Sequence, residues 1–225
     1  MSARKIPKSY RNVTGQISSH KSNKPISFES KLERDFYLIF DYELNVISIQ
    51  DQPIRIEYVE ERDGKANIRS YTPDVYIERT EGYPNIIGEV KYYNDLKEDW
   101  ARLKPKFKQA IKYAKQQKEP TVFVIFTDRC KNISNKDYIR NIHFLDDYND
   151  YATKDYESIK DLYSDGDTIG DILEYYSDDK MEQAQLVPSI WALVKQQIIE
   201  VDLTQWLTLK TKILSIKDPN DIELR

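Results

Sequence analysis

Two short motifs, fifteen residues apart, carry side chains suited to the hydrolysis of a phosphate ester. The first is Pro73-Asp74 and the second is Glu89-Val90-Lys91. Glu89 and Lys91 are two residues apart on an expected strand, so their side chains project from the same face. Antiparallel pairing across a turn at residues 80–82 would bring Asp74 opposite Glu89, at a spacing of about 5 Å. The motifs therefore predict two adjacent carboxylates beside a lysine.

Such a carboxylate pair favours a bound divalent cation. Like charges repel each other unless a cation lies between them, and carboxylate oxygens suit Mg²⁺, with Mn²⁺ as a substitute. The Lys91 ammonium could orient or activate the attacking water and neutralise the charge that develops on the phosphate. Glu33, on an expected helix, supplies another ligand if that helix packs against the sheet edge. Glu29, one helical turn earlier, is the competing candidate.

Hydrophobic periodicity predicts the elements that would position these groups. Apolar residues recur every four positions from Phe28 to Phe40, which predicts a helix that ends near Asp41. Strands are expected over residues 46–49, 54–59, 68–77 and 85–92, and the last three would form a meander. Asp63-Gly64 provides the first turn of this meander.

A second helix and a further strand complete the expected core. Apolar residues from Leu96 to Ala114 have helical spacing, and Pro105 would kink this helix or open a new one. Residues 121–127 are expected to form a strand buried on both faces after this crossover, and residues 142–145 an added edge strand. This order of elements predicts an α/β core with a mixed sheet.

The chain changes character after Asp147. Residues 148–167 are rich in aspartate, so they are expected to form a linker. Residues 168–225 are expected to hold a helix over 169–176, a helix that starts at Pro188 and an alternating strand over 207–213. Short helices followed by a hairpin predict a small winged-helix-like domain.

Several of these motifs together resemble those of a known enzyme family. Glu33, Pro73-Asp74 and Glu89-Val90-Lys91 resemble the PD-(D/E)XK nuclease motif. With the stretches 28–35, 52–53 and 71–74, they make residues 4–130 similar to the TnsA family, the endonuclease subunits of heteromeric transposases. The resemblance implies a restriction-endonuclease-like nuclease domain over residues 28–147.

The resemblance also implies site residues and partners. The active site would consist of Glu33, Asp74, Glu89 and Lys91, and Mg²⁺ would be held by the three carboxylates and the backbone carbonyl of Val90. Some family members have glutamine at the position of Glu89. The enzyme would cut one strand at the 5′ ends of the transposon, beside a TnsB-like DDE transposase that cuts and joins the 3′ ends. A TnsC-like AAA+ ATPase would contact the C-terminal domain.

Opposite charges at the two ends of the chain predict different binding partners. Residues 1–28 hold six basic side chains and no acidic one, whereas residues 150–225 hold sixteen acidic and eight basic ones. The basic arm, residues 1–27, is expected to bind the phosphates of double-stranded DNA. Lysines of the second helix would do the same, or form a solvated face. These predicted DNA-binding residues are Arg4, Lys5, Lys8, Arg11, Lys21, Lys24, Lys108 and Lys112.

The acidic end favours a protein partner over DNA. A winged helix that binds DNA usually carries excess positive charge, which this region lacks. Trp191 and Trp206 are candidate contact residues, although burial in a small core is the more ordinary place for a tryptophan. The expected partner of residues 168–225 is therefore a protein.

Composition excludes several classes of protein. The chain has no run of about 20 apolar residues and no apolar N-terminal run, so neither a membrane helix nor a signal peptide is expected. A cytoplasmic location is therefore expected, and the resemblance to a transposase subunit implies association with the bacterial nucleoid. Cys130 is the single cysteine, which excludes an internal disulfide, and with two histidines it is too little for a structural zinc site.

Two other functions fit the same motifs. Another PD-(D/E)XK nuclease, for restriction or repair, would explain the carboxylates and the lysine but not the charged ends. A non-catalytic DNA-binding subunit would keep the fold, but it has no need for this combination. Glu-Val-Lys on a strand is common by itself, and acidic residues near turns usually face water. The spacing of both motifs after a helix that carries a glutamate favours the nuclease.

Overall fold

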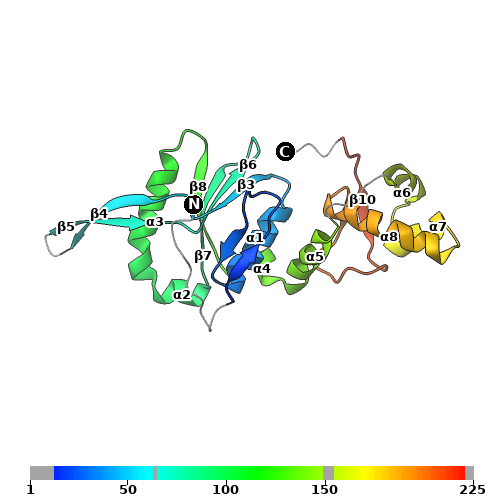
Figure 1. The fold of residues 1–225 in the computed structure, drawn as a ribbon, viewed down its shortest axis with the longest axis horizontal. Coiled ribbons are helices and arrows are strands. Elements are labelled where there is room, and N and C mark those ends of the chain that lie inside the picture. Colours follow the sequence, from blue (N-terminus) through cyan, green and yellow to red (C-terminus); the bar gives the residue numbers. More distant parts are fainter. Residues whose placement is uncertain (1–12, 63–64, 149–154, 221–225) are drawn as a thin grey trace. The chain divides into compact units, whose positions relative to one another are not determined.

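The computed structural model describes residues 13–62, 65–148 and 155–220 of the chain (Figure 1). The chain divides into two compact units, an N-terminal unit that extends to Ser134 and a C-terminal unit that begins at Asn135. This boundary precedes the expected one because α5 (Lys136–Asp146) packs against α8 (Lys180–Lys195). Residues of the expected linker form α6 (Tyr156–Leu162), which buries Ile159 completely. None of the helices in the described ranges is long and apolar enough to cross a bilayer.

A four-stranded mixed sheet forms the centre of the N-terminal unit, in the order β3-β6-β7-β8. The strands are β3 (Val46–Asp51), β6 (Val75–Arg79), β7 (Asn85–Val90) and β8 (Thr121–Phe126). The first three pair antiparallel, whereas β8 runs parallel to β7. A parallel neighbour requires a crossover, which α2 (Tyr93–Glu98) and α3 (Trp100–Lys115) supply. The predicted α/β class with a mixed sheet is confirmed.

Two separate hydrophobic clusters pack α1 (Lys31–Tyr42) and α3 against this sheet. Phe36 of α1 shares one cluster with Ile86 and Val90 of β7. Leu103 and Phe107 of α3 form the other, against which Phe123 and Ile125 of β8 pack. Because neighbouring residues of a strand face opposite sides, Glu89 lies on the face opposite to that of Val90 and α1.

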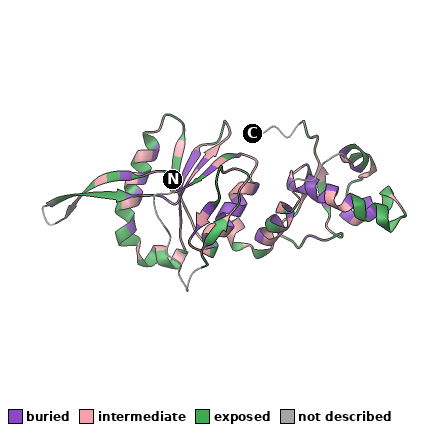
Figure 2. Ribbon diagram, viewed as in Figure 1, coloured by how far each residue is buried: buried purple, intermediate pink, exposed green. Residues whose placement is uncertain are grey.

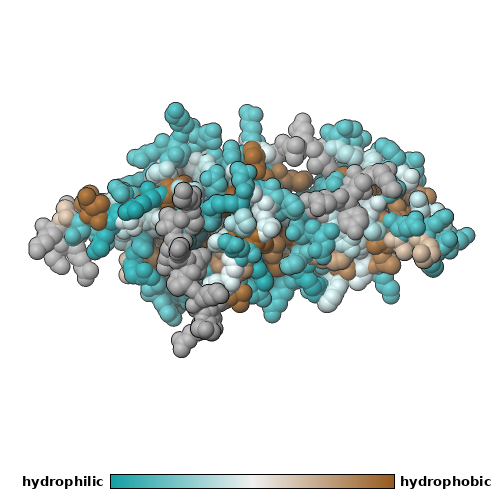
Figure 3. All heavy atoms as spheres, in the orientation of Figure 1, coloured by the Kyte–Doolittle hydropathy of each residue, from teal (hydrophilic) through white to brown (hydrophobic). Residues whose placement is uncertain are grey.

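The expected strand over 68–77 is wrong, because its residues belong to two different sheets. β5 (Lys65–Tyr71) pairs with β4 (Ile56–Arg62) in a two-stranded ribbon, whereas β6 pairs with β3 and β7. The chain changes partner at residues 72–74, where Pro73 has no N–H to donate to a neighbouring strand. Val59 and Ile68 pair across the ribbon and are 61% and 80% exposed. Figures 2 and 3 show the ribbon as largely exposed, with hydrophobic atoms on its surface. The expected turn at 63–64 lies outside the described residues.

The predicted arm is structured from Val13 onward. β1 (Gly15–Ile17) pairs with β2 (Ile26–Phe28), and the Ile26 side chain is completely buried. Phe28 therefore belongs to a strand, and the helix predicted from its spacing begins three residues later. Arg4, Lys5, Lys8 and Arg11 lie outside the described residues.

Two prolines that were expected to kink or begin a helix lie inside helices instead. Pro105 is within α3, and the helical stretch is interrupted at Asp99 instead. Pro188 is in the middle of α8, which begins after Asp179, whose side chain accepts a hydrogen bond from Met181 N. Packing of the surrounding turns outweighs the loss of one backbone hydrogen bond at each proline.

Other expected elements are also corrected. Residues 142–145 belong to α5, not to an edge strand, because Ile142 and Leu145 are buried at helical spacing. The strand expected to be buried on both faces, β8, lies at one edge of the sheet. It is therefore only half-buried, and Val122 is 39% exposed. On α3 the buried stripe contains Ala110, and Ile111 is exposed.

Within its described residues, the C-terminal unit combines four helices with a short hairpin. α7 (Ile169–Tyr176) is confirmed, and β9 (Ile199–Val201) pairs antiparallel with β10 (Ile213–Ile216). The predicted strand over 207–213 is wrong, since β10 begins only at Ile213. Trp191 is buried with its ring 5.3 Å from that of Phe144, measured between centroids, whereas Trp206 is 65% exposed.

Candidate active site

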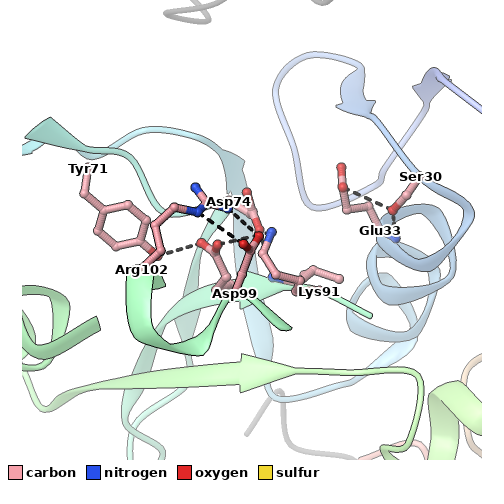
Figure 4. Close-up of polar contacts among 9 residues, drawn as sticks. Ser30, Glu33, Tyr71, Asp74, Lys91, Asp99 and Arg102 are labelled. Carbon is pink, nitrogen blue, oxygen red and sulfur yellow. Dashed lines mark hydrogen bonds and ion pairs between the residues drawn. The ribbon is translucent and has the colours of Figure 1, made fainter. Parts of the chain in front are cut away.

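A cavity of about 490 Å³ in the N-terminal unit brings together the residues predicted to carry chemistry. Glu33, Asp74, Glu89, Val90 and Lys91 all line it. Further wall residues are Glu29, Gln52, Arg55, Tyr71 and Lys106. In Figure 4, Asp74 and Lys91 are seen between Tyr71 of β5 and Glu33 of α1. Residues from four separate elements therefore meet at one end of the sheet.

Strand register places Asp74 next to Glu89. β6 and β7 pair Val75 with Gly88, so the next positions outward are Asp74 and Glu89. The Asp74 carboxylate accepts a hydrogen bond from Val90 N at 2.8 Å, and its backbone carbonyl accepts one from Gln52 N at 2.9 Å. A Cβ atom at Gly88 would lie 2.6 Å from Val75 Cγ1, so glycine permits this close strand approach. The predicted pairing of the two motifs is confirmed.

The two oxygens of Glu89 have different partners. The Tyr71 hydroxyl donates to Oε2 at 2.6 Å, and the Lys91 ammonium lies 3.7 Å from Oε1. Glu89 is 5% exposed, and the Lys91 side chain is 28% exposed. One oxygen of Glu89 is thus held by a neutral donor, while the other faces the cation.

Burial dominates the electrostatics of these carboxylates. It raises the pKa of Asp74 well above the ordinary value, and the nearby Glu89 charge raises it further, against the Val90 hydrogen bond. Burial also raises the pKa of Glu89, against the Tyr71 hydroxyl and the Lys91 ammonium. The charged forms of both groups are therefore destabilised, and a proton or a metal cation would relieve the repulsion.

Glu33 lies in the first turn of α1, where it also caps the helix. Ser30 Oγ accepts a hydrogen bond from Glu33 N and donates one to Glu33 Oε1, both at 3.1 Å. Glu29 N donates to Glu33 Oε2 at 2.8 Å. Burial raises the pKa of Glu33. The capping contacts fix the carboxylate at the cavity wall.

Glu29 offers a different kind of carboxylate to the same cavity. Its Oε1 atom is buried and has no hydrogen-bond partner among the described residues. Both oxygens of Glu33, in contrast, already accept hydrogen bonds. Glu29 precedes α1 instead of lying on it, but both glutamates reach the cavity, so Glu29 remains a candidate beside Glu33.

The donor set of the cavity fits a hard divalent cation. Asp74, Glu89 and Glu33 supply carboxylate oxygens, and the cavity leaves room for water and a phosphate group. Burial is the main cause of the raised pKa values of Asp74 and Glu89, and the Lys91 ammonium offsets it only in part. Mg²⁺ would supply the missing positive charge.

The predicted DNA-binding lysines fall into two groups. The Lys24 ammonium lies 2.6 Å from Asp51 Oδ1, and that of Lys21 donates to the backbone carbonyls of Phe40 and Glu43. These two lysines therefore bind residues 21–24 to α1, to the residue after it and to β3 within the same unit. Lys108 and Lys112 are exposed on α3, as a phosphate-binding face requires.

Lys106 is a cavity residue that the sequence analysis missed. It lies on the side of α3 that carries the buried residues Leu103, Phe107 and Ala110, and its ammonium is 5.8 Å from the centre of the Tyr71 ring. Its positive charge helps to lower the pKa of Glu89. A lysine within an otherwise apolar stripe was the signal that could have identified it.

Comparison with known proteins agrees with this site. Residues 43–128 match the family model described as TnsA-like endonuclease N terminal, which confirms the predicted resemblance to TnsA-like nucleases. The match contains Asp74, Glu89 and Lys91, whereas Glu33 precedes it. No curated protein matches the chain. The region of similarity is therefore the part of the chain that holds the sheet and the paired carboxylates.

Proposed function

We propose that the chain is a TnsA-like endonuclease subunit of a heteromeric transposase, which hydrolyses one phosphodiester at each 5′ end of the element in the presence of Mg²⁺. The observation that carries this proposal is the pair of half-buried Asp74 and buried Glu89, with Lys91 beside it, in one cavity. The match over residues 43–128 supports a nuclease of this class.

The side chains of the cavity divide the work between them. Asp74, Glu89, Glu33 and the Val90 carbonyl would hold Mg²⁺, with Glu29 as the alternative to Glu33. When bound, the ion acts as a Lewis acid and lowers the pKa of a water molecule. The Lys91 ammonium orients the attacking water and offsets the charge that develops on the phosphate. Tyr71 holds Glu89 Oε2, so that Glu89 presents its other oxygen to the cavity.

The C-terminal unit supports a winged-helix-like interpretation. Along the chain it places α6, the bridging residue Thr168, α7, α8, β9 and β10, and Thr168 pairs with Lys212. The second half of α8, from Ser189 to Lys195, is buried, so it offers no open face to a DNA groove. Together with its acidic charge, this supports contact with a protein, which we propose is a TnsC-like AAA+ ATPase.

The proposal is tested by cleavage of DNA that carries the ends of the element. Wild-type protein, with a TnsB-like DDE transposase, should cut the 5′ ends in Mg²⁺ or Mn²⁺, and Ca²⁺ should support binding with little cleavage. Lys91→Ala should lower the cleavage rate about 100-fold or more. Lys97→Ala, which removes an exposed lysine of α2, is the matched control and should cut normally.

Other outcomes distinguish the competing functions. Cutting that needs neither the element's ends nor the partner transposase would favour a restriction or repair nuclease. Binding of the ends without any cutting, with every partner and Mg²⁺ present, would favour a non-catalytic DNA-binding subunit.

A further inference from the structure

A second pocket of about 330 Å³ adjoins the catalytic cavity. The two share Gln52, Arg55 and Thr72 as walls. The rest of its lining is Lys24, Gln50, Asp51, Pro53 and Ile54. We call this second space the side pocket. Anything bound in the side pocket would therefore lie next to the place where the phosphodiester is cut.

Gln52 stands between the two spaces in an unusual backbone conformation. Its φ angle is 45°, and Gln197 is the other non-glycine residue with positive φ in the described ranges. Its backbone N–H is bonded to the Asp74 carbonyl at 2.9 Å, which ties this conformation to the catalytic aspartate. Glycine would adopt the same φ without strain, so the backbone alone does not require a glutamine here.

The side pocket offers side-chain amides for hydrogen bonding, whereas its charged groups are paired with one another or with neighbours. The side-chain amides of Gln50 and Gln52 have no hydrogen-bond partner among the residues that the structure describes. The Lys24 ammonium is neutralised by Asp51 at 2.6 Å, and the Asp51 side chain is 5% exposed. Arg55, the other cation that lines the side pocket, is exposed and lies 3.7 Å from Glu57 Oε1, whereas a pocket for a free phosphate would require unpaired cations.

This chemistry matches one face and one edge of a nucleobase. A glutamine amide carries a donor and an acceptor side by side, as required to pair with a base edge such as that of adenine. Pro53 and Ile54 add apolar surface on which the ring can rest. The side pocket thus combines amide groups that can pair with a base edge and apolar residues that can contact the face of the ring.

We propose that the side pocket binds the nucleobase adjacent to the scissile phosphate and that Gln52 reads its edge. This inference rests on the proposed function, because it names part of the DNA substrate of the same site. It gives the Gln52-Pro53 sequence a role in substrate choice, separate from the carboxylates.

The test compares two glycine substitutions in the full-length protein. Gln52→Gly removes the amide but keeps the backbone N–H and removes the left-handed strain. Gln197→Gly does the same at φ 59° in the C-terminal unit and is the matched control. Each protein, with the partner transposase and Mg²⁺, cuts a library of end-containing DNA in which the bases flanking the cut are randomised.

We expect wild type and Gln197→Gly to prefer the same base at one position next to the cut. Gln52→Gly should lose this preference, and its cleavage of the preferred substrate should fall about 10- to 100-fold. Cleavage that falls equally on all sequences would overturn the inference, since it would show that Gln52 only positions Asp74. Cleavage by wild type without any base preference would also overturn it, while the proposed function would stand.

A binding measurement separates failure of the inference from failure of the proposed function. A photoreactive thiobase placed next to the expected cut, with Ca²⁺ present, should cross-link wild type within residues 50–54. If wild type fails to cut but gives this cross-link, the proposed catalysis is wrong and the side pocket stands. If wild type cuts but the cross-link maps elsewhere, the side pocket is wrong and the catalysis stands.

Discussion

The carboxylates of the two units lie in opposite surroundings. In the N-terminal unit, burial raises the pKa values of Glu33, Asp74 and Glu89. In the C-terminal unit, hydrogen bonds from Thr168 lower the pKa of Asp171, and those from Lys217 and Ser215 lower that of Glu200. In the first group, Lys91 and Lys106 offset the effect of burial only in part, whereas the second group has its partners within the fold.

This difference distinguishes the candidate active site of the N-terminal unit from the acidic surface of the C-terminal unit. Residues 150–225 hold sixteen acidic side chains, but those with lowered pKa values cap a helix or bind neighbouring donors. Even the buried Lys195 ammonium has a partner, Asp146 Oδ1 at 2.8 Å. Burial that outweighs the nearby positive charges, rather than the number of acids, marks the candidate active site.

The largest expected effect comes from neutralising Asp74 in the N-terminal unit, with a neutralised carboxylate of the C-terminal unit as the control. Asp74→Asn should lower cleavage at least about 10³-fold, because it removes a metal ligand. It should also raise the melting temperature of the N-terminal unit at pH 7, by about 2–4 °C for each kcal/mol of repulsion removed. Asn keeps an acceptor for Val90 N. Cleavage assays and scanning calorimetry measure the two changes.

Asp171→Asn is the matched control in the C-terminal unit. It weakens the capping box with Thr168, so it should lower the melting temperature and leave cleavage unchanged. A lower melting temperature for Asp74→Asn would contradict the idea that this unit keeps unfavourable charges at its site.

A second prediction extends the comparison to the binding of DNA. Deletion of residues 1–12 removes Arg4, Lys5, Lys8 and Arg11 but leaves β1 and β2 in place. If all four contact phosphates, the slope of log affinity against log salt should become shallower by up to about 3.6. Fluorescence anisotropy at several salt concentrations measures this slope. An unchanged slope would assign DNA binding to other surfaces, such as the lysines of α3.

A smaller effect is expected from the hydroxyl that holds Glu89. Tyr71→Phe removes the hydrogen bond that lowers the Glu89 pKa, so this pKa should rise further. Cleavage requires ionised Glu89; its rate near neutral pH should therefore fall about 10-fold, and the acidic limb of its pH profile should move to higher pH. Ser215→Ala removes the equivalent donor to Glu200 and should leave the profile in place. An equal fall at every pH would contradict this role of Tyr71.

The smallest effect is an opposite pH dependence of stability in the two units. Unfolded Asp and Glu titrate near about 3.9 and 4.3. Raised pKa values mean that the folded N-terminal unit binds protons more tightly than the unfolded chain, so it loses stability as pH rises from this range towards neutrality. The lowered pKa values of Asp171 and Glu200 mean that the C-terminal unit loses stability as pH falls through the same range.

Proteolysis in urea at pH 2 to 7, with an acid-stable protease at the lower values and followed by mass spectrometry, reports the unfolding of each unit separately. Added Mg²⁺ should flatten the dependence in the N-terminal unit only, because it favours the ionised carboxylates there. Parallel pH trends in the two units would remove the basis of the comparison.

The sequence by itself determined the pairing of Asp74 with Glu89. A short turn between two consecutive strands admits few registers, and a shift by one residue would move every side chain to the other face. The residues of α1 and α3 that face the sheet were also largely predictable, since helical spacing identifies a buried stripe. In these places the local pattern and the final packing agree, so the sequence-based prediction is confirmed.

Only the tertiary structure decided which distant groups join that pair. Lys106 and Gln52 enter the site because α3 packs against β4 and β8 and the end of β3 lies beside β6, and no local period encodes those contacts. Tertiary packing likewise kept Pro105 and Pro188 inside helices and moved the boundary between the units to Ser134. The reason is physical: periodicity reports which face of an element is buried, whereas contacts between elements depend on how all of their faces fit together.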